Sequence, residues 1–216
     1  MNMIKKIPAA LLIGLSLISS FAIAGVEEDV STLQREWEKV KYQSPESSHE
    51  KGFESLIKEA NKLVTQNPNR AEILIWQAII ESSYAGAKGG LGALTHVKNA
   101  KKTFEKALEI NPSALDGSAY TSLGSLYYQV PSWPIGFGDD KKAAEFLKKG
   151  LSINPDGIDS NYFYADFLFR NGDYAGAEKS LRKALQAPAR NGRKVADDGR
   201  RKEINQLLEK VAEKRK

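Results

Sequence analysis

The chain has 216 residues, of which 41% are hydrophobic and 27% charged, and its formal net charge is +5. This length suits one domain with a sizeable core, and the ordinary composition argues against a disordered chain. The chain contains no cysteine, which excludes disulfides, a thiol nucleophile and sulfur-bound metal. Residues 190–216 hold 10 basic and 5 acidic side chains, and we interpret this basic tail as the solvated face of a terminal helix.

Residues 1–24 have the pattern of a cleavable export signal. Lys5 and Lys6 precede a mostly apolar stretch, and Ala22-Ile23-Ala24 matches the small-x-small pattern of a cleavage site. An acidic stretch at residues 27–29 follows, where a membrane anchor would carry a basic flank. We therefore expect cleavage after Ala24, a periplasmic protein without a stable membrane anchor, and no nucleic-acid partner.

The first part of the mature chain predicts a pair of helices. Residues 27–43 carry apolar side chains at helical spacing, and Ser44-Pro45 ends this helix, since the residue before proline avoids the helical region. Ser47 and Glu50 form a capping-box pattern, which predicts a second helix that reaches about Gln66.

Two further helix pairs follow, each with an enlarged turn. Residues 71–84 and 94–110 are predicted helices on either side of a glycine-rich insertion at residues 85–93. The next pair surrounds a second insertion at residues 129–139. Three helices end on the same dipeptide, in which proline blocks continuation of the helix: Asn67-Pro68, Asn111-Pro112 and Asn154-Pro155. This recurrence indicates internal repeats.

The clearest pair spans Asn161 to Pro188. Small and large apolar residues recur at helical spacing on both sides of a tight turn, in which Gly172 is predicted to have a positive φ and Asp173 to cap the second helix. The residues of this pattern are Tyr164, Ala165, Leu168, Gly172, Asp173, Tyr174, Ala177, Leu181 and Ala184. The pattern resembles the tetratricopeptide repeat, a helix–turn–helix unit of roughly 34 residues.

The resemblance covers about residues 28–188 and implies an all-α fold. We expect a tetratricopeptide-like α-solenoid of stacked antiparallel helix pairs within a domain of residues 25–216. Its units are predicted at about 27–68, 69–112, 115–155 and 158–188. An amphipathic helix at 195–212 would cap the stack, because terminal repeats need a polar outer face.

The sequence shows no catalytic, metal or nucleotide motif. The two histidines, His49 and His96, lie far apart, and the glycine insertion matches no phosphate-binding spacing, so we interpret it as a plain loop. Asp159 and Asp166 have the residue type of an acid–base pair, but no other catalytic group supports them. We therefore expect a protein that is not an enzyme and holds neither a cofactor nor a metal.

The second insertion is a candidate recognition loop. It carries Trp133 and Phe137 and is stiffened by Pro131 and Pro134. A rigid loop with large aromatic side chains loses little entropy on binding. Two interpretations stay open, and both can hold at once. The aromatics contact a partner, or they fold back to cover the contact between the helices.

The resemblance also implies a concave groove, lined by the first helix of each pair, that binds peptides. Carried onto this sequence, the groove residues are Ser118, Thr121, Ser125, Tyr128, Asp159, Tyr162, Asp166, Phe169 and Arg170. Their mixture of hydroxyl, aromatic and charged groups suits a polar peptide. We expect Tyr162 and Phe169 to be bare aromatic surface.

These observations favour a non-catalytic periplasmic module that binds or scaffolds a protein or peptide partner in the cell envelope. Self-association is left open. A second hypothesis is that the chain is similar to the tetratricopeptide-type T component of tripartite (TRAP) transporters, an accessory protein that binds a small ligand or a solute-binding protein. The chain lacks the lipoprotein cysteine of lipid-anchored members. An enclosed ligand cavity would favour the second hypothesis, and an open groove the first.

Overall fold

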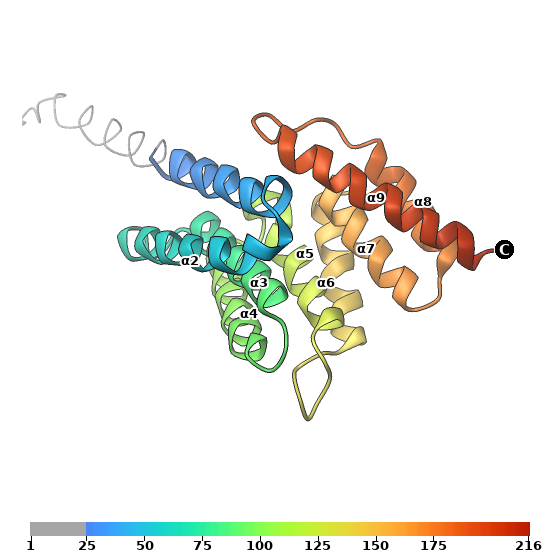
Figure 1. The fold of residues 1–216 in the computed structure, drawn as a ribbon, viewed down its shortest axis with the longest axis horizontal. Helices are drawn as coiled ribbons and strands as arrows, with labels where there is room; N and C mark the ends of the chain where they lie inside the picture. Colours follow the sequence, from blue (N-terminus) through green and yellow to red (C-terminus); the bar gives the residue numbers. More distant parts are fainter. Residues whose placement is uncertain (1–24) are drawn as a thin grey trace, which may run out of the picture.

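The computed structural model describes residues 25–216, so the predicted export signal lies outside the described residues (Figure 1). This part of the chain folds as helices that pack against their neighbours in chain order, from the N-terminal pair to α9. The expected all-α class and the solenoid of stacked helix pairs are confirmed.

The described chain begins with a helix over residues 25–38, which continues as a π-helical turn, η1 (Lys39–Gln43). A short 3-10 turn, η2 (Glu46–Ser48), leads into α2 (His49–Gln66). The remaining helices are α3 (Ala71–Lys88), α4 (Ala93–Ile110), α5 (Ala114–Gln129), α6 (Asp140–Ile153), α7 (Ile158–Arg170), α8 (Tyr174–Leu185) and α9 (Lys194–Lys214).

Two local predictions are wrong. The Ser47–Glu50 capping box does not form, because Ser47 lies inside η2 and α2 begins after Ser48, whose hydroxyl donates to the Pro45 carbonyl at 2.7 Å. The first insertion is also shorter than expected. The segment Ala85–Lys88 continues α3 for one more turn, and Gly89, with φ of +64°, then ends the helix.

Small residues allow the paired helices to approach closely. Ala165 on α7 and Ala177 on α8 are fully buried, in agreement with their predicted place between the two helices. On the preceding pair, a Cβ atom built on Gly124 of α5 would lie 2.7 Å from the Leu147 side chain of α6. Contacts this close leave no room for a larger side chain, so these positions fix the spacing of the stack.

The turn of the α7–α8 pair has the predicted geometry. Gly172 has φ of +82°, and the Asp173 carboxylate accepts from the Gly176 backbone N–H at 2.8 Å. Satisfying a free N–H at the start of a helix stabilises that helix.

The turns within the helix pairs share one edge of the molecule. Because α3, α5 and α7 are each followed by an antiparallel partner, their turns at residues 89–92, 130–139 and 171–173 lie at the same ends of the helices, at the lower side of Figure 1. We call these three turns the turn edge. The two insertions therefore protrude together without interrupting the stack.

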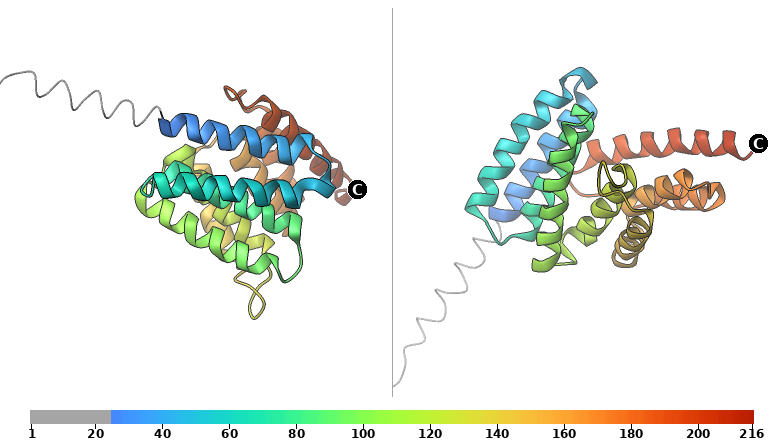
Figure 2. Two further views of the ribbon diagram at one scale, coloured as in Figure 1. Left: turned by 60° about the vertical axis from the view of Figure 1, so that its left-hand side comes forward. Right: turned by 90° about the horizontal axis from the view of Figure 1, so that it is seen from below.

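The first and last helices of the described chain meet, at the end of η1 and the start of α9. The segment between α8 and α9, residues 186–193, runs back to η1, and α9 begins beside the N-terminal helices (Figure 2). Tyr42 of η1 packs directly on Gly199 of α9, where an added Cβ would lie 2.4 Å from the tyrosine ring. We call residues 186–193 the C-terminal arm.

We expect Gly172→Val to lower the free energy of unfolding by about 1–2 kcal/mol, through strain at positive φ alone, since nothing lies within 4 Å of a Cβ at this position. Gly86→Ala is the matched control, because Gly86 lies in α3 with equally open surroundings but no positive φ. The control should be neutral or gain up to about 1 kcal/mol. Urea unfolding measures both, and equal stability of the two variants would contradict the turn assignment.

Candidate partner-binding surface

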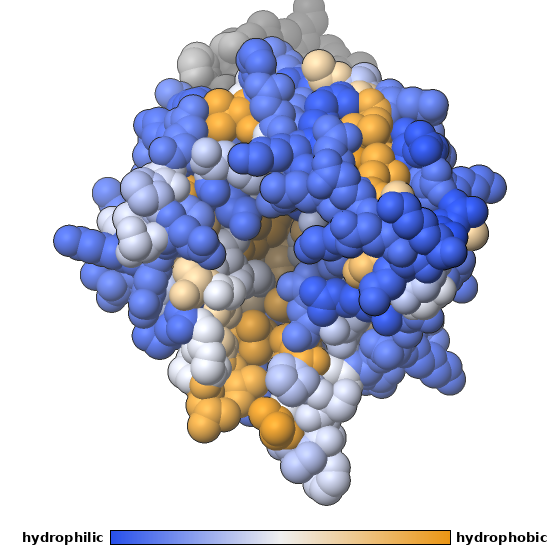
Figure 3. Space-filling view, turned by 45° about the vertical axis from the view of Figure 1, so that its right-hand side comes forward, coloured by the Kyte–Doolittle hydropathy of each residue, from blue (hydrophilic) through white to orange (hydrophobic). Residues whose placement is uncertain are grey.

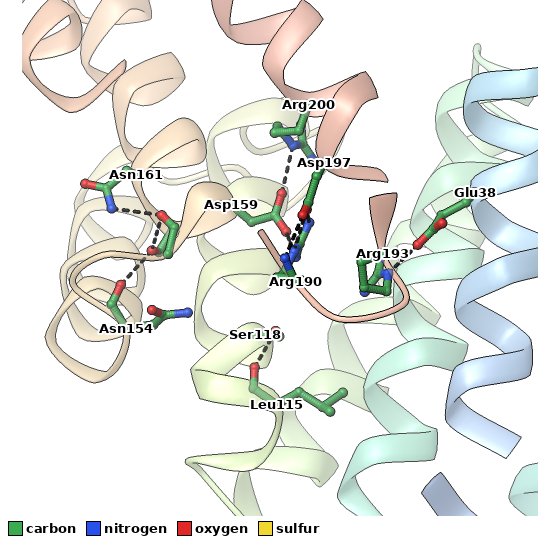
Figure 4. Close-up of polar contacts among 12 residues, drawn as sticks. Glu38, Leu115, Ser118, Asn154, Asp159, Asn161, Arg190, Arg193, Asp197 and Arg200 are labelled. Carbon is green, nitrogen blue, oxygen red and sulfur yellow. Dashed lines mark hydrogen bonds and ion pairs between the residues drawn. The ribbon is translucent and has the colours of Figure 1, made fainter. Parts of the chain in front are cut away.

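The C-terminal arm is bound to α7 by a network of ion pairs. Arg190 donates from Nη1 to Asp159 Oδ2 at 2.7 Å and from Nε to Asp197 Oδ1 at 2.7 Å. Arg200 of α9 donates from Nε to the other Asp159 oxygen at 2.8 Å (Figure 4). Both carboxylate oxygens of the predicted groove residue Asp159 are therefore paired with arginines of its own chain. Asp159 is not free for a partner in this structure.

The same network sets the charge state of Asp159. Burial by itself would raise the pKa of this carboxyl group, but the positive charges of Arg200 and Arg190 outweigh that effect and lower the pKa to about 2. Burial by itself would lower the pKa of Arg200, but Tyr42 and the carboxylates of Asp159 and Glu203 hold it well above its usual value. The ion pairs are consequently present at any pH above about 4.

A second contact of the arm is made with the N-terminal helix. The Arg193 guanidinium pairs with Glu38, and its centre lies 5.1 Å from the centroid of the Trp76 ring on α3. Figure 4 shows Arg193 and Glu38 on one side of the arm and Asp159 on the other. The arm thus joins the first unit to α7.

Two other predicted groove residues are buried. Thr121 faces α6, where a Cβ on Gly150 would lie 2.4 Å from the threonine hydroxyl oxygen, and Ser125 is also buried. Both assignments are wrong, because this side of α5 packs within its helix pair. Ser118 is half-buried and donates its hydroxyl to the Leu115 carbonyl at 2.6 Å, which closes a left-handed turn at residues 115–117.

Tyr162 and Phe169 are not bare surface, contrary to the prediction. Both are half-buried and pack on the C-terminal part of the core. The Tyr162 ring lies under Arg200, whose guanidinium centre is 4.3 Å from the ring centroid, and the Phe169 ring contacts Tyr174 at 5.5 Å. Truncating either side chain would disturb packing, so neither is a clean probe of binding.

The structure brings three predicted residues together at the lower end of α5 and α7. Tyr128 donates its hydroxyl to Asp166 Oδ2 at 2.8 Å, and the same oxygen is 3.4 Å from Nε of Arg170. The Arg170 guanidinium lies 5.1 Å from the centroid of the Tyr128 ring. Burial and the charge of Asp166 raise the pKa of Tyr128, so it remains a hydroxyl donor. Asp159 and Asp166 have separate partners and form no carboxylate pair.

The second insertion presents one aromatic residue and hides the other. Trp133 is 86% exposed, whereas Phe137 is half-buried with its ring centroid 5.5 Å from that of Tyr127. Backbone bonds hold the loop, from Gly138 N to the Pro131 carbonyl at 3.0 Å and from Asp139 N to the Tyr127 carbonyl at 2.9 Å. Phe137 therefore folds back onto the helices, whereas Trp133 stays exposed and its contact with a partner stays a prediction.

Two further apolar residues on the turn edge were not singled out from the sequence. Leu91 is 80% exposed in the α3–α4 turn, and Ile135 is 55% exposed beside Trp133. We call Leu91, Trp133 and Ile135 the turn-edge patch. In the sequence, Leu91 is the single large apolar residue of the glycine-rich first turn, and that isolation is the signal that indicates an exposed apolar side chain.

The surface is hollowed elsewhere as well. Figure 3 shows a face hollowed near its centre, with hydrophilic residues above it and at its sides and apolar residues within it and below it. A separate hollow of about 310 Å³ lies between α2, α3 and α4, and polar residues such as Asn61, Gln77 and Glu81 line it. Within residues 25–216 no three potential ligands gather as a metal site, and no helix there has the length and hydropathy to cross a membrane.

Comparison with known proteins identifies the repeats. Residues 135–197 and residues 91–113 each match a family model described as a tetratricopeptide repeat. These two segments of the chain match tetratricopeptide repeats. The matched residues include the α7–α8 pair, on which the sequence resemblance was strongest, and confirm the resemblance there. The boundaries of the four predicted units stay predictions.

Solved structures similar to this repeat chain include two with low identity. One, the crystal structure of MamA, is 19% identical with a TM-score of 0.44, and the similarity covers 76% of this chain and 89% of that one. The other, the crystal structure of MamA protein, is 18% identical with a TM-score of 0.44, over 87% of this chain and 92% of that one. No curated protein matches the sequence.

We expect Asp159→Asn to lower the free energy of unfolding by roughly 1–2 kcal/mol, because two arginines of the repeat chain lose their anion, although water screens these pairs at an Asp159 side chain that is 36% exposed. The contribution of Asp159 is fully present above about pH 4 and is lost as the pH falls to about 2, since folding lowers its pKa.

Urea unfolding between pH 5 and pH 2 measures both effects, and stability of the variant should depend less on pH across this window. Asp198→Asn is the matched control, since Asp198 makes an exposed ion pair with Lys194 and should contribute less than about 1 kcal/mol. Equal losses in the two variants would contradict the assigned role of Asp159.

Proposed function

We propose that this protein is a non-catalytic scaffold that binds a partner protein at its turn edge. The proposal rests on the exposure of Trp133, whose side chain is 86% exposed on a loop held by backbone hydrogen bonds. Large apolar side chains exposed together on an ordered surface mark interaction sites, and tryptophan is among the residues that contribute most to binding energy.

The fold supports the same surface. Tetratricopeptide repeats stack their helices so that turns of successive pairs lie side by side, and here the turns of two pairs carry the turn-edge patch. The Tyr128–Asp166–Arg170 cluster lies at the end of the neighbouring helices, and Arg170 is exposed. An apolar centre beside a polar cluster matches the anatomy of a protein interface.

We propose the turn edge as the binding surface in place of the full concave groove that the sequence resemblance implies. At α7 the groove position Asp159 is occupied by the chain's own Arg190 and Arg200, and on α5 Thr121 and Ser125 are buried. The preformed loop requires no such displacement before a partner binds, which keeps the entropic cost of association low.

We further propose that the partner lies in the cell envelope. This part rests on the export pattern of Lys5, Lys6 and the Ala22-Ile23-Ala24 cleavage signal, which lie outside the described residues. N-terminal sequencing of the protein purified from its host tests it. A mature chain that begins at Gly25 is the expected result, and an intact N-terminus would contradict it.

We expect Trp133→Ala to leave the free energy of unfolding within about 0.5 kcal/mol and to weaken partner binding by roughly 2 kcal/mol, or about 30-fold. The partner is first captured from the host envelope and identified by native mass spectrometry, and its affinity for each variant is then measured. Ile110→Ala is the matched control, because Ile110 is another exposed apolar residue but lies at the other end of α4 from the turn edge.

Loss of binding in both variants, or in neither, would contradict the proposed surface. The same spectra test the transport-accessory hypothesis, which stays a prediction from the sequence. A small-molecule adduct that survives Trp133→Ala would favour that hypothesis over the scaffold.

A further inference from the structure

The C-terminal arm inserts one arginine into a site built entirely by other parts of the chain. Arg193 pairs with Glu38 of the N-terminal helix, and its guanidinium lies 5.1 Å from the ring centroid of Trp76 on α3. Trp37 supports that ring edge to face, with the two centroids 5.9 Å apart. We call Glu38, Trp37 and Trp76 the arginine site.

The two tryptophans of the arginine site have contacts of their own besides Arg193. Trp37 donates its indole N–H to the Ser83 hydroxyl at 2.8 Å, which orients the ring. With Arg193 in place, Glu38 is 4% exposed and Trp76 is 5% exposed. A buried carboxylate beside an aromatic face suits a guanidinium, which combines a planar stacking surface with a fork of N–H donors.

The site also has an unused hydrogen-bonding group. Among the side chains of residues 25–216, the indole N–H of Trp76 is buried without any acceptor. A buried polar group without a partner is costly, and such groups in folded proteins call for an explanation. A carbonyl group on an incoming segment would supply the acceptor that the arm does not provide.

A related arrangement occurs on α7. Arg200 donates to Asp159 and lies over Tyr162 and Phe163, with centroid distances of 4.3 Å and 4.7 Å. At both places a carboxylate lies beside an aromatic ring, and an arginine of the chain pairs with the carboxylate. This repetition indicates that the chemistry of this side of the molecule is selective for arginine.

The arm can leave the arginine site without loss of α9. Its residues are not helical, most of them are exposed, and Gly192 adopts φ of +69°. The helix that follows is anchored separately, because Ile204, Leu207 and Val211 pack with α8 in the C-terminal part of the core. The part of the arm from Arg190 to Arg193 is therefore held by charged contacts, whereas Ala187 at its start and α9 after it pack in the apolar core.

We propose that the arginine site binds an arginine of an extended segment in the partner protein, and that Arg193 is its built-in competitor. The inference rests on the proposed scaffold function, since it names the chemistry of one contact with that partner. A partner with a basic, arginine-bearing segment would displace the arm and take its place against Glu38 and Trp76.

The test measures exchange at the site and needs no knowledge of the partner. All variants carry Trp133→Phe, which leaves Trp37 and Trp76 as the fluorescent reporters. The probe is a peptide with the sequence of residues 186–194, titrated into the full chain. We expect Arg193→Ala to bind the peptide at least tenfold more tightly than the parent, because the competitor is removed. Adding Glu38→Gln should reverse the gain at least tenfold.

Two controls define the chemistry. Arg182→Ala removes an exposed arginine that pairs with Glu178, and it should leave peptide affinity unchanged. A peptide with lysine in place of its second arginine keeps the charge but loses the planar fork, so it should bind at least threefold more weakly. Peptide affinity that is equal in the parent and in folded Arg193→Ala would overturn the proposal, as would a gain that Glu38→Gln does not reverse.

The remaining outcomes are also decisive. If circular dichroism shows that Arg193→Ala is unfolded, Arg193→Lys replaces it, with an expected gain of at least threefold, and no gain overturns the inference. Light scattering should show a monomer, and a dimer whose site excludes the peptide would indicate exchange of arms between copies instead. Failure of peptide exchange while Trp133→Ala still abolishes partner capture would reject this inference and leave the scaffold function intact.

Discussion

The structure depends on the pairing of three charged side chains, half-buried Asp159, half-buried Arg190 and buried Arg200. Arginines on both the arm and α9 share the two oxygens of one carboxylate, and a second carboxylate, Asp197, holds Arg190 from the other side. Removing charged groups from water is costly, and that cost is offset only when every group is paired with good geometry. This requirement fixes where the arm runs, and the course of the arm in turn decides which parts of the inner surface stay open.

The position of the arm divides the molecule into a closed part and an open part. On the closed side, arginines of the chain form ion pairs with Glu38 of the N-terminal helix and with Asp159 of α7. On the open side, the turns present Leu91, Trp133 and Ile135 on a backbone that is already ordered. A scaffold arranged in this way can bind first through apolar contact at the turn edge and afterwards exchange ionic contacts at the arm.

The sequence predicted the helix pairs well because their causes are local. Asn67-Pro68, Asn154-Pro155 and Gly172 act through the backbone of their own residues, and the matches to tetratricopeptide repeats agree with that pattern. The candidate site was predicted less well, because it depends on which distant residue arrives. Nothing near Asp159 in the sequence indicates that Arg190 will reach it, and the burial of Thr121 is decided by Gly150 on the next helix.

The contact between Tyr42 and Gly199 has a consequence for how the chain loses its structure. In an open array of repeats, each unit touches only its neighbours, so unfolding can begin at either free end and spread inward. Here the first unit is packed against the last helix, with space for the tyrosine ring only because residue 199 has no side chain. Unfolding of the first unit must therefore also break a contact with α9, which couples the two ends of the array to one another.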